Sequence, residues 1–70
     1  MKISARNQLR GTVVDVTRGQ TTAHVRIELS AGSYITSSIT NEAVDELALV
    51  PGDLVTAIIK ASDVMVGKSA

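Results

Sequence analysis

The stretch Thr22-Ala23-His24-Val25-Arg26-Ile27-Glu28-Leu29 alternates apolar and polar residues without a break. Side chains on a β-strand point alternately to opposite faces, so the apolar members of this stretch share one face and the polar members share the other. The stretch therefore predicts a strand with one buried face and one solvent-facing face. Its apolar face comprises Ala23, Val25, Ile27 and Leu29.

Two turns place further strands on either side of this stretch. Residues 11–17 are rich in β-branched side chains and end at Arg18-Gly19-Gln20, where Gly19 can supply a positive φ. After the opening stretch, Ser30-Ala31-Gly32-Ser33 predicts a second turn, and residues 34–39 alternate again. We therefore expect a hairpin followed by a third strand.

The second half of the chain predicts a helix and then a turn. Residues 40–47 change to a helical period, acidic residues fill the first turns, and Thr40 or Asn41 can cap the N-terminus. Val50-Pro51-Gly52-Asp53 has proline and glycine at the positions that a type II turn favours. We expect one short helix in this region.

The remaining segments predict two more strands. Residues 54–60 form a nearly continuous apolar run, which is typical of a strand covered on both faces. Ser62-Asp63 turns the chain, residues 64–66 form a last short strand, and residues 67–70 form a frayed tail. The expected order is β-β-β-α-β-β.

This order predicts a mainly all-β fold: a small OB-like five-stranded barrel, closed or partly open, with one short helix between the third and fourth strands. With 70 residues and no linker, repeat or low-complexity stretch, the chain is expected to form a single domain over residues 1–70. Barrels of this kind host single-strand binders, oligosaccharide binders and small-ligand domains, so the fold alone does not identify the function.

The composition excludes several kinds of site. Lys and Arg number 7 and Asp and Glu number 7, so the chain has no broad positive charge for nucleic acid or an anionic membrane. Cysteine is absent and His24 is the only histidine, which excludes disulfides, thiolate chemistry and a multi-histidine zinc site. No apolar run is long enough for a signal peptide or a membrane span, so we expect a soluble cytoplasmic protein.

The hydrophobic content is high for a chain of this size. A core this small typically contributes only about 3–5 kcal/mol, and small proteins usually add disulfides, a metal or subunit contacts. Hydrophobic residues make up 44% of the chain, which is more than one small core consumes. We therefore expect an oligomer.

Two common functions have little support. Binding of single-stranded nucleic acid on an OB barrel needs aromatic side chains on which bases stack, whereas Tyr34 is the only aromatic residue. Catalysis lacks an evident nucleophile or acid–base pair, because His24 lies on the polar face of its strand and carboxylates such as Asp15 and Glu28 are expected to be solvated. We expect no enzyme activity, and an interaction or single-strand-binding OB module remains the alternative.

Three short clusters of hydrogen-bond donors could bind a small oxyanion. Ser4-Ala5-Arg6 offers a hydroxyl, backbone N–H groups and a guanidinium, and Lys60-Ala61-Ser62 offers an ammonium and a hydroxyl. Thr40 begins the expected helix, where N–H groups lack intrahelical partners, although Glu42 in the first turn could satisfy the helix dipole itself. Taken singly, each cluster is more often structural, as a solvated arm, an edge charge or a helix start.

Together these clusters resemble those of the molbindins, the stand-alone Mop domains of the TOBE group. The resemblance runs from Met1 to about Val66, and the opening SARN with the late PGD and KAS elements is its most specific part. It rests on residues 4–9 with Gly11, on Ile39-Thr40, on residues 49–53, on Val55-Thr56-Ala57 and on residues 59–62.

The resemblance implies a cytoplasmic protein that binds molybdate, and tungstate as well, for storage, buffering or delivery. No organic cofactor, free metal cation, nucleic acid or membrane is implied. The family assembles OB-like barrels as a hexamer, a trimer of dimers, with ligands between subunits. Carried over by position, one side of the pocket would be lined by Ser4, Ala5, Arg6, Lys60, Ala61 and Ser62, and a neighbouring subunit would supply Thr40 and Ala43.

Two details of the resemblance concern single positions. Some molbindins have a serine where this chain has Ala43, so one hydroxyl contact would be lost or replaced by backbone. Family members can also hold a second class of oxyanion site, made largely of backbone groups. The resemblance places that second site at Gly19, Thr21 and Thr22.

Overall fold

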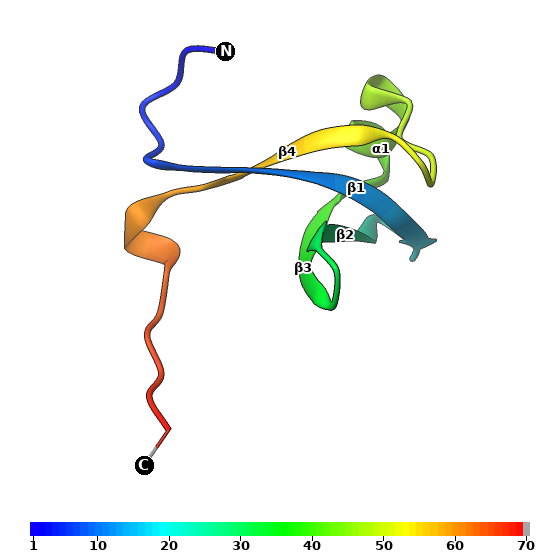
Figure 1. The fold of residues 1–70 in the computed structure, drawn as a ribbon. Coiled ribbons are helices and arrows are strands. Elements are labelled where there is room, and N and C mark those ends of the chain that lie inside the picture. Colours follow the sequence, from blue (N-terminus) through cyan, green and yellow to red (C-terminus); the bar gives the residue numbers. More distant parts are fainter. Residues whose placement is uncertain (70) are drawn as a thin grey trace.

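The structure is a computed structural model, and it describes residues 1–69 of the chain. Three strands are followed by a helix, a fourth strand and a 3-10 turn (Figure 1). This confirms the expected order up to the fourth strand, although the first strand begins at Asn7 and not at Gly11. The elements are β1 (Asn7–Arg18), β2 (Thr22–Ser30), β3 (Ser33–Thr40), α1 (Asn41–Leu47), β4 (Leu54–Ile59) and the turn Ala61–Asp63.

The strands form one antiparallel sheet in the order β3-β2-β1-β4, which curls into an open half-barrel (Figure 1). β1 is long enough to serve two partners, because residues 7–12 pair with β4 and residues 12–18 pair with β2. The register of β1 against β2 shifts between Val13 and Asp15, and such a bulge bends the strand and increases its twist. Strands β3 and β4 lie at the two opposite edges of the sheet.

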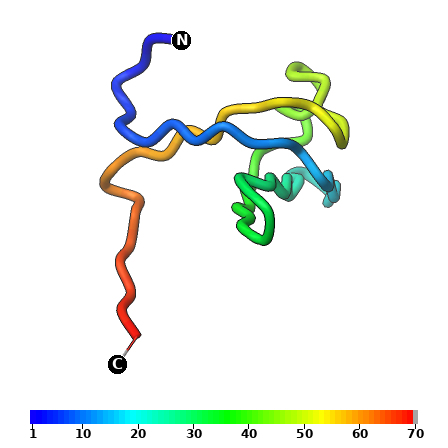
Figure 2. The backbone as a smooth tube through the Cα atoms, in the orientation of Figure 1, coloured from blue at the N-terminus to red at the C-terminus, as the bar shows by residue number. Residues whose placement is uncertain are grey.

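The first half of β1 and the C-terminal part of β4 run together away from the rest of the sheet (Figure 2). We name this part the arm, residues 1–10 and 56–69, and the remainder the body, residues 11–55. Gly11 lies at the junction, where a Cβ atom would come within 2.5 Å of Ile27 Cγ2 and 2.7 Å of the Glu28 carbonyl oxygen. Only glycine lets β1 pass this close to β2.

The core lies inside the curl of the body. The apolar face of β2 is buried as the alternation predicts, except that Leu29 is only partly buried. Val44 of α1 is 1% exposed and closes the core from the helix side. The fully buried residues are Val13, Ala23, Val25, Ile27 and Val44.

Both ends of α1 have defined caps. Thr40 has an extended backbone and its hydroxyl oxygen accepts a hydrogen bond from the Ala43 N–H at 3.0 Å, which confirms the expected N-cap. At the other end Ala48 adopts a left-handed conformation with φ 50°, a role that glycine usually fills. The following turn is confirmed by Gly52, which has φ 99°.

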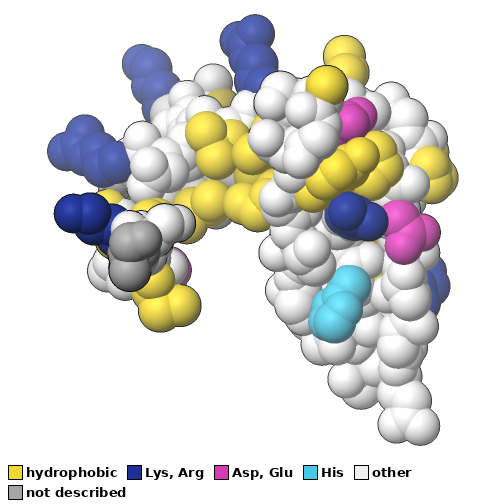
Figure 3. Space-filling view, turned by 60° about the horizontal axis from the view of Figure 1, so that its bottom comes forward, with side chains coloured by type: hydrophobic (Ala, Val, Ile, Leu, Met, Phe, Trp, Pro, Cys, Tyr) yellow, Lys and Arg dark blue, Asp and Glu magenta, His cyan; other side chains and the backbone are white. Residues whose placement is uncertain are grey.

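Two predictions about the strands are wrong. Residues 54–60 are not covered on both faces, because β4 is an edge strand on which Leu54 is 87% exposed and Ile58 is 47% exposed. Residues 64–66 form no strand, because the chain runs away from both sheet edges there, and Met65 is 93% exposed. A band of apolar side chains is consequently visible between the arm and the body (Figure 3).

The prediction about Gly19 is also wrong. Positive φ angles occur at Gly32, Ala48 and Gly52 and not at Gly19. The reason for glycine at this position is space, because a Cβ atom on Gly19 would lie 2.9 Å from the carbonyl oxygen of Thr22. Ala70, the last residue of the expected tail, lies outside the described residues.

Candidate functional site

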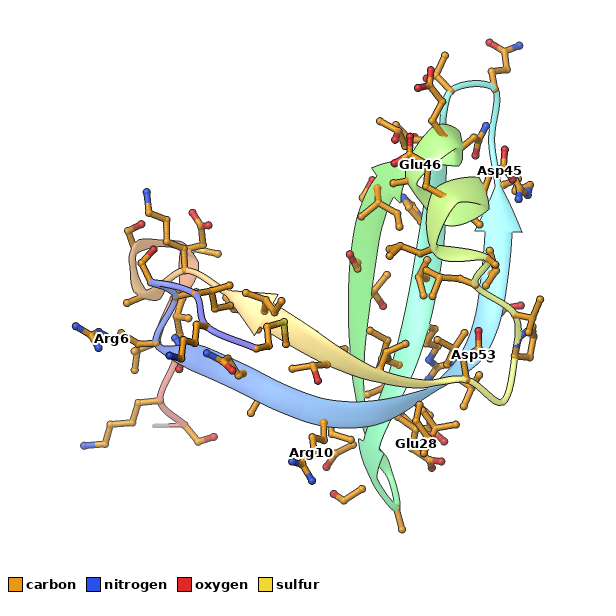
Figure 4. All side chains as sticks on the ribbon, turned by 90° about the horizontal axis from the view of Figure 1, so that it is seen from above. Arg6, Arg10, Glu28, Asp45, Glu46 and Asp53 are labelled. Carbon is orange, nitrogen blue, oxygen red and sulfur yellow. The ribbon has the colours of Figure 1, made fainter. Side chains whose placement is uncertain are left out.

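The end of the arm gathers candidate residues from the two ends of the chain. Asn7 and Ile59 form the last pair of the β1–β4 ladder, and Asn7 Nδ2 donates to the Ile59 carbonyl at 3.2 Å. Because the strands are antiparallel, the residues before Asn7 and those after Ile59 leave the ladder at the same end, where Figure 4 shows Arg6. We name this group the arm cluster: Ser4, Ala5, Arg6, Lys60, Ala61 and Ser62.

The arm cluster contains backbone donors without partners. The chain turns at Ala61–Asp63, where the Asp63 N–H donates to the Lys60 carbonyl at 2.9 Å and the Val64 N–H donates to the Ala61 carbonyl at 3.2 Å. The N–H groups of Ala61 and Ser62 have no backbone acceptor among residues 1–69, and neither have those of Ala5 and Arg6. These four groups remain able to donate to a ligand.

The two cationic side chains of the arm cluster are also unpaired. Arg6 and Lys60 are exposed, and neither forms an ion pair within residues 1–69. Ser4 and Ser62 add two exposed hydroxyls. A guanidinium, an ammonium, hydroxyls and free amides are the donors that bind an oxyanion, and the charged ones give the stronger hydrogen bonds. The structure therefore brings together six of the eight residues expected to line one pocket.

The other two residues, Thr40 and Ala43, lie on the body at the start of α1, far from the arm cluster (Figure 1). The Ala43 N–H already donates to Thr40 Oγ1 at 3.0 Å, which leaves the Thr40 hydroxyl hydrogen as the free donor of this pair. The helix around them is acidic, with Glu42, Asp45 and Glu46. One chain does not bring Thr40 and Ala43 to the arm cluster.

The turn between β1 and β2, which holds the candidates for a second oxyanion site, lies beside Thr40. Thr22 pairs directly with Thr40 in the sheet. Asn41 fastens the turn to the helix, since its backbone N–H donates to the Thr21 carbonyl at 3.0 Å and its Nδ2 donates to the Gly19 carbonyl at 3.0 Å. The local sequence indicates Asn41 only as a possible helix cap, because a contact with a turn about twenty residues away leaves no local pattern.

A second contact between the same elements was also missed. Arg18, the last residue of β1, forms an ion pair with Asp45 of α1 at 2.6 Å between Nη2 and Oδ1. Both side chains are largely exposed, so this pair contributes little to stability on its own. Together with the two Asn41 hydrogen bonds it connects the turn to α1, so that Gly19, Thr21, Thr22 and Thr40 lie in one corner of the body.

The structure gives little support for a base-stacking surface, a metal site or a membrane span among the described residues. Arg26 stacks on Tyr34 with its guanidinium carbon 4.1 Å from the ring centre, so one face of the only aromatic ring is covered. Among residues 1–69 the structure assembles no group of three or more His, Cys, Asp or Glu side chains suited to a metal ion. No helix of the described chain combines the length and the apolar character needed to cross a bilayer.

The family model and the similar proteins that match this chain point to the same family. Residues 3–66 match the TOBE domain. The chain is 48% identical over 66 residues to "Molybdenum-pterin-binding protein 1" of Clostridium pasteurianum, covering 94% of this chain and 97% of the relative.

Solved structures of similar proteins share the OB-like fold. A molybdate-binding protein from Sporomusa ovata superposes with a TM-score of 0.90 at 41% identity, covering 97% of this chain and 100% of that chain. The cytoplasmic molybdate-binding protein ModG, solved with molybdate bound, gives a TM-score of 0.88 at 48% identity, covering 93% of this chain and 46% of that chain. This chain belongs to the TOBE domain family and, within it, to the molybdenum-pterin-binding (Mop, or molbindin) proteins.

Proposed function

We propose that this chain binds molybdate, without catalysing a reaction, in a pocket completed between copies of the chain. The names of its relatives describe molybdenum-pterin-binding and molybdate-binding proteins, which supports molybdate as the ligand. The arm cluster is the observation that carries the proposal. It unites Arg6, Lys60, two serine hydroxyls and free backbone amides at one end of the arm.

The donor set suits a tetrahedral dianion. Molybdate presents four oxygens that accept hydrogen bonds, and the two cationic side chains balance its charge. No carboxylate of residues 1–69 pairs with Arg6 or Lys60, so these charges are available to the ligand. Burial between subunits would strengthen each charge-assisted bond relative to an open surface.

A neighbouring copy would supply Thr40 and Ala43. These two residues lie far from the arm cluster in one chain, so they reach the pocket only from another copy (Figure 1). The apolar groove of about 270 Å³ and the exposed side chains of β4 support burial against further subunits. The hexamer implied by the molbindin resemblance, a trimer of dimers, is the assembly we propose.

Three finer parts of the proposal follow from the resemblance. Tungstate has nearly the same size and charge as molybdate, and we propose that the same donors bind it. The corner formed by Gly19, Thr21 and Thr22 is the proposed second oxyanion site. The protein would store, buffer or deliver the oxyanion, because a reversible pocket needs no bond-making step.

Calorimetric titration of the purified oligomer with molybdate, with sulfate as competitor, tests the proposal. Arg6→Ala and Lys60→Ala should each weaken binding by about 10- to 100-fold, since a hydrogen bond to a charged group contributes about 1.5–3 kcal/mol. Arg10→Ala is the matched control, because Arg10 is an exposed cation of the same arm outside the cluster and should leave affinity unchanged. Unchanged affinity in both cluster variants would reject the site.

The alternative function, an OB module for single-stranded nucleic acid, is tested separately. Fluorescence anisotropy with short labelled single strands at low salt should detect salt-sensitive binding if this alternative is correct. We expect no binding, because base stacking needs open aromatic faces and Arg26 covers one face of Tyr34.

A further inference from the structure

Two side-chain amides stand next to the arm cluster, and each donates to a backbone carbonyl. Asn7 Nδ2 donates to the Ile59 carbonyl at 3.2 Å, and Gln8 Nε2 donates to the Ala5 carbonyl at 3.4 Å. Successive strand residues point to opposite faces, so the two amides lie on opposite sides of the β1–β4 ladder. Neither Asn7 nor Gln8 is one of the six residues of the arm cluster, and nothing described above gives them a part in ligand binding.

The two accepting carbonyls have one property in common, because each belongs to a peptide unit whose N–H is part of the arm cluster. The Ala5 carbonyl is joined to the Arg6 N–H, and the Ile59 carbonyl is joined to the Lys60 N–H. Neither of these N–H groups has a backbone acceptor among residues 1–69. The described residues contain no cis peptide, and in a planar trans peptide the C=O and N–H bonds point in opposite directions. A bond that holds the carbonyl therefore fixes the direction of the N–H.

The end of the ladder is the place where a peptide needs such a bond. Asn7 and Ile59 form the last pair, so no further strand pair holds the peptide that joins Ile59 to Lys60 from its outer side. If this peptide rotated, its carbonyl oxygen would take the place of its N–H, and a carbonyl oxygen repels an oxyanion. The Asn7 amide opposes that rotation. It also polarises the peptide, which makes the N–H a stronger donor.

From these contacts we infer that Asn7 and Gln8 are positioning residues for the oxyanion. Asn7 directs the Lys60 N–H toward the ligand, and Gln8 directs the Arg6 N–H, each by binding the carbonyl of the same peptide unit. Asn7 has the larger effect, because its hydrogen bond is shorter and partly buried whereas the Gln8 bond is exposed. The inference deepens the proposed function and rests on it, since the oxyanion is the molybdate proposed above.

A neutral amide suits this position beside an anion site. Its NH₂ group donates to the carbonyl, and it brings no charge that would compete with Arg6 and Lys60 for the ligand. A carboxylate of the same shape could only accept, so it would repel both the Ile59 carbonyl and the dianion. The amide that directly follows Arg6 in the sequence therefore serves the site through the backbone and not by contact with the oxyanion.

Three single variants of the full chain test the inference. Asn7→Leu and Gln8→Met nearly keep the size of each side chain and remove its donor. The matched control is Leu9→Ala, because Leu9 lies on the same face of β1 as Asn7 and pairs with Ala57, so its truncation loosens the ladder without removing either hydrogen bond. In calorimetric titration with molybdate, Asn7→Leu should weaken binding about tenfold and Gln8→Met about threefold, while Leu9→Ala should leave affinity unchanged.

Nuclear magnetic resonance separates positioning from a general loss of structure. An HNCO spectrum of isotope-labelled protein gives one peak for each peptide unit, which joins the carbonyl carbon of one residue to the N–H of the next. Without molybdate, Asn7→Leu should move the peak that joins Ile59 to Lys60, and Leu9→Ala should leave that peak in place. Added molybdate should move the Lys60 amide proton of the wild type downfield, and this change should be smaller in Asn7→Leu.

Several results would overturn the inference while leaving the proposed function intact. One is equal molybdate affinity of the wild type and Asn7→Leu, and another is an Ile59–Lys60 peak that Asn7→Leu does not move. Equal weakening by Asn7→Leu and Leu9→Ala would mean that only the firmness of the ladder matters. Unchanged affinity in Gln8→Met would remove Gln8 from the inference. A wild-type chain that binds no molybdate would instead reject the proposed function, and the inference with it.

Discussion

The hydroxyl oxygen of Thr40 accepts a hydrogen bond from the backbone N–H of Ala43 at 3.0 Å. One side chain thereby caps α1 and keeps its hydroxyl hydrogen free for the proposed molybdate contact, so one hydroxyl group would serve both stability and binding. The two roles can be separated by substitution, because a carboxylate caps a helix as well as a hydroxyl does but cannot donate to an anion.

Thr40→Ala should lower the free energy of unfolding by about 1 kcal/mol through loss of the cap, and Thr40→Ser should preserve it. Thr40→Asp should keep the cap and abolish molybdate binding, since its charge repels the dianion. Thermal denaturation at fixed protein concentration and calorimetric titration measure the two effects. Molybdate affinity that survives in Thr40→Asp would remove Thr40 from the pocket.

Arg6→Lys should weaken molybdate binding by about tenfold while keeping the charge, because an ammonium cannot reproduce the planar fork of a guanidinium. The same exchange at Arg10 should have no effect, since Arg10 lies outside the arm cluster. Titration of both variants compares them directly. Equal affinity of Arg6→Lys and wild type would mean that Arg6 acts only as a point charge.

Gly11→Ala should destabilise the fold by about 1–3 kcal/mol, as overpacking of a well-packed site does. Its Cβ atom would meet Ile27 Cγ2 at 2.5 Å and the Glu28 carbonyl oxygen at 2.7 Å, and a backbone atom cannot move aside cheaply. Gly67→Ala is the control, because nothing lies within 4 Å of its Cβ position. Chemical denaturation of the two variants should differ clearly, and similar values would contradict the close crossing of β1 and β2.

Ala48→Gly should stabilise the protein by about 0.5–1 kcal/mol, because glycine adopts the left-handed conformation that Ala48 holds at φ 50° without steric cost. Ala43→Gly, inside the same helix, should instead destabilise it by about 0.5–1 kcal/mol. If the same alanine-to-glycine change raises the free energy of unfolding at position 48 and lowers it at position 43, the backbone strain lies at the C-terminal end of α1. A loss of stability in both variants would argue against that strain.

Local patterns predicted most of the body. The period of two in residues 22–29 identified β2 and its buried face, and the change of period at Thr40 identified α1 and its cap. These features depend on neighbours along the chain. Gly52 similarly marked its turn, because it follows a proline and glycine tolerates the positive φ that a type II turn requires there.

The errors arose where the structure depends on distant or external partners. An apolar strand such as β4 is covered only if another surface reaches it, and residues 64–66 form a strand only if an edge is available. Gly19 was misread because a glycine required for space and a glycine required for positive φ look the same in sequence. The Asn41 contacts with the turn were missed for a related reason, since they join residues about twenty positions apart.

The sequence predicted the two groups of residues that make up the arm cluster, but it did not predict that the two groups lie side by side. Its union depends on the antiparallel register that sets Asn7 opposite Ile59. If that register shifted by one residue, Arg6 and Lys60 would no longer lie beside each other at the end of the ribbon. No sequence pattern fixes the register of an exposed two-stranded ribbon.

The pairing of β1 with β4 also sets the length of the arm in fixed steps. Each strand residue adds about 3.3 Å, and successive side chains alternate between faces. Adding one residue pair to the ribbon would move the arm cluster outward by about 3.3 Å and turn it to the opposite face of the ribbon. Adding two pairs would return it to the original face after an outward shift of about twice that length. The reach of the arm therefore changes only in coarse increments, and insertions compatible with its present orientation come in pairs on both strands at once.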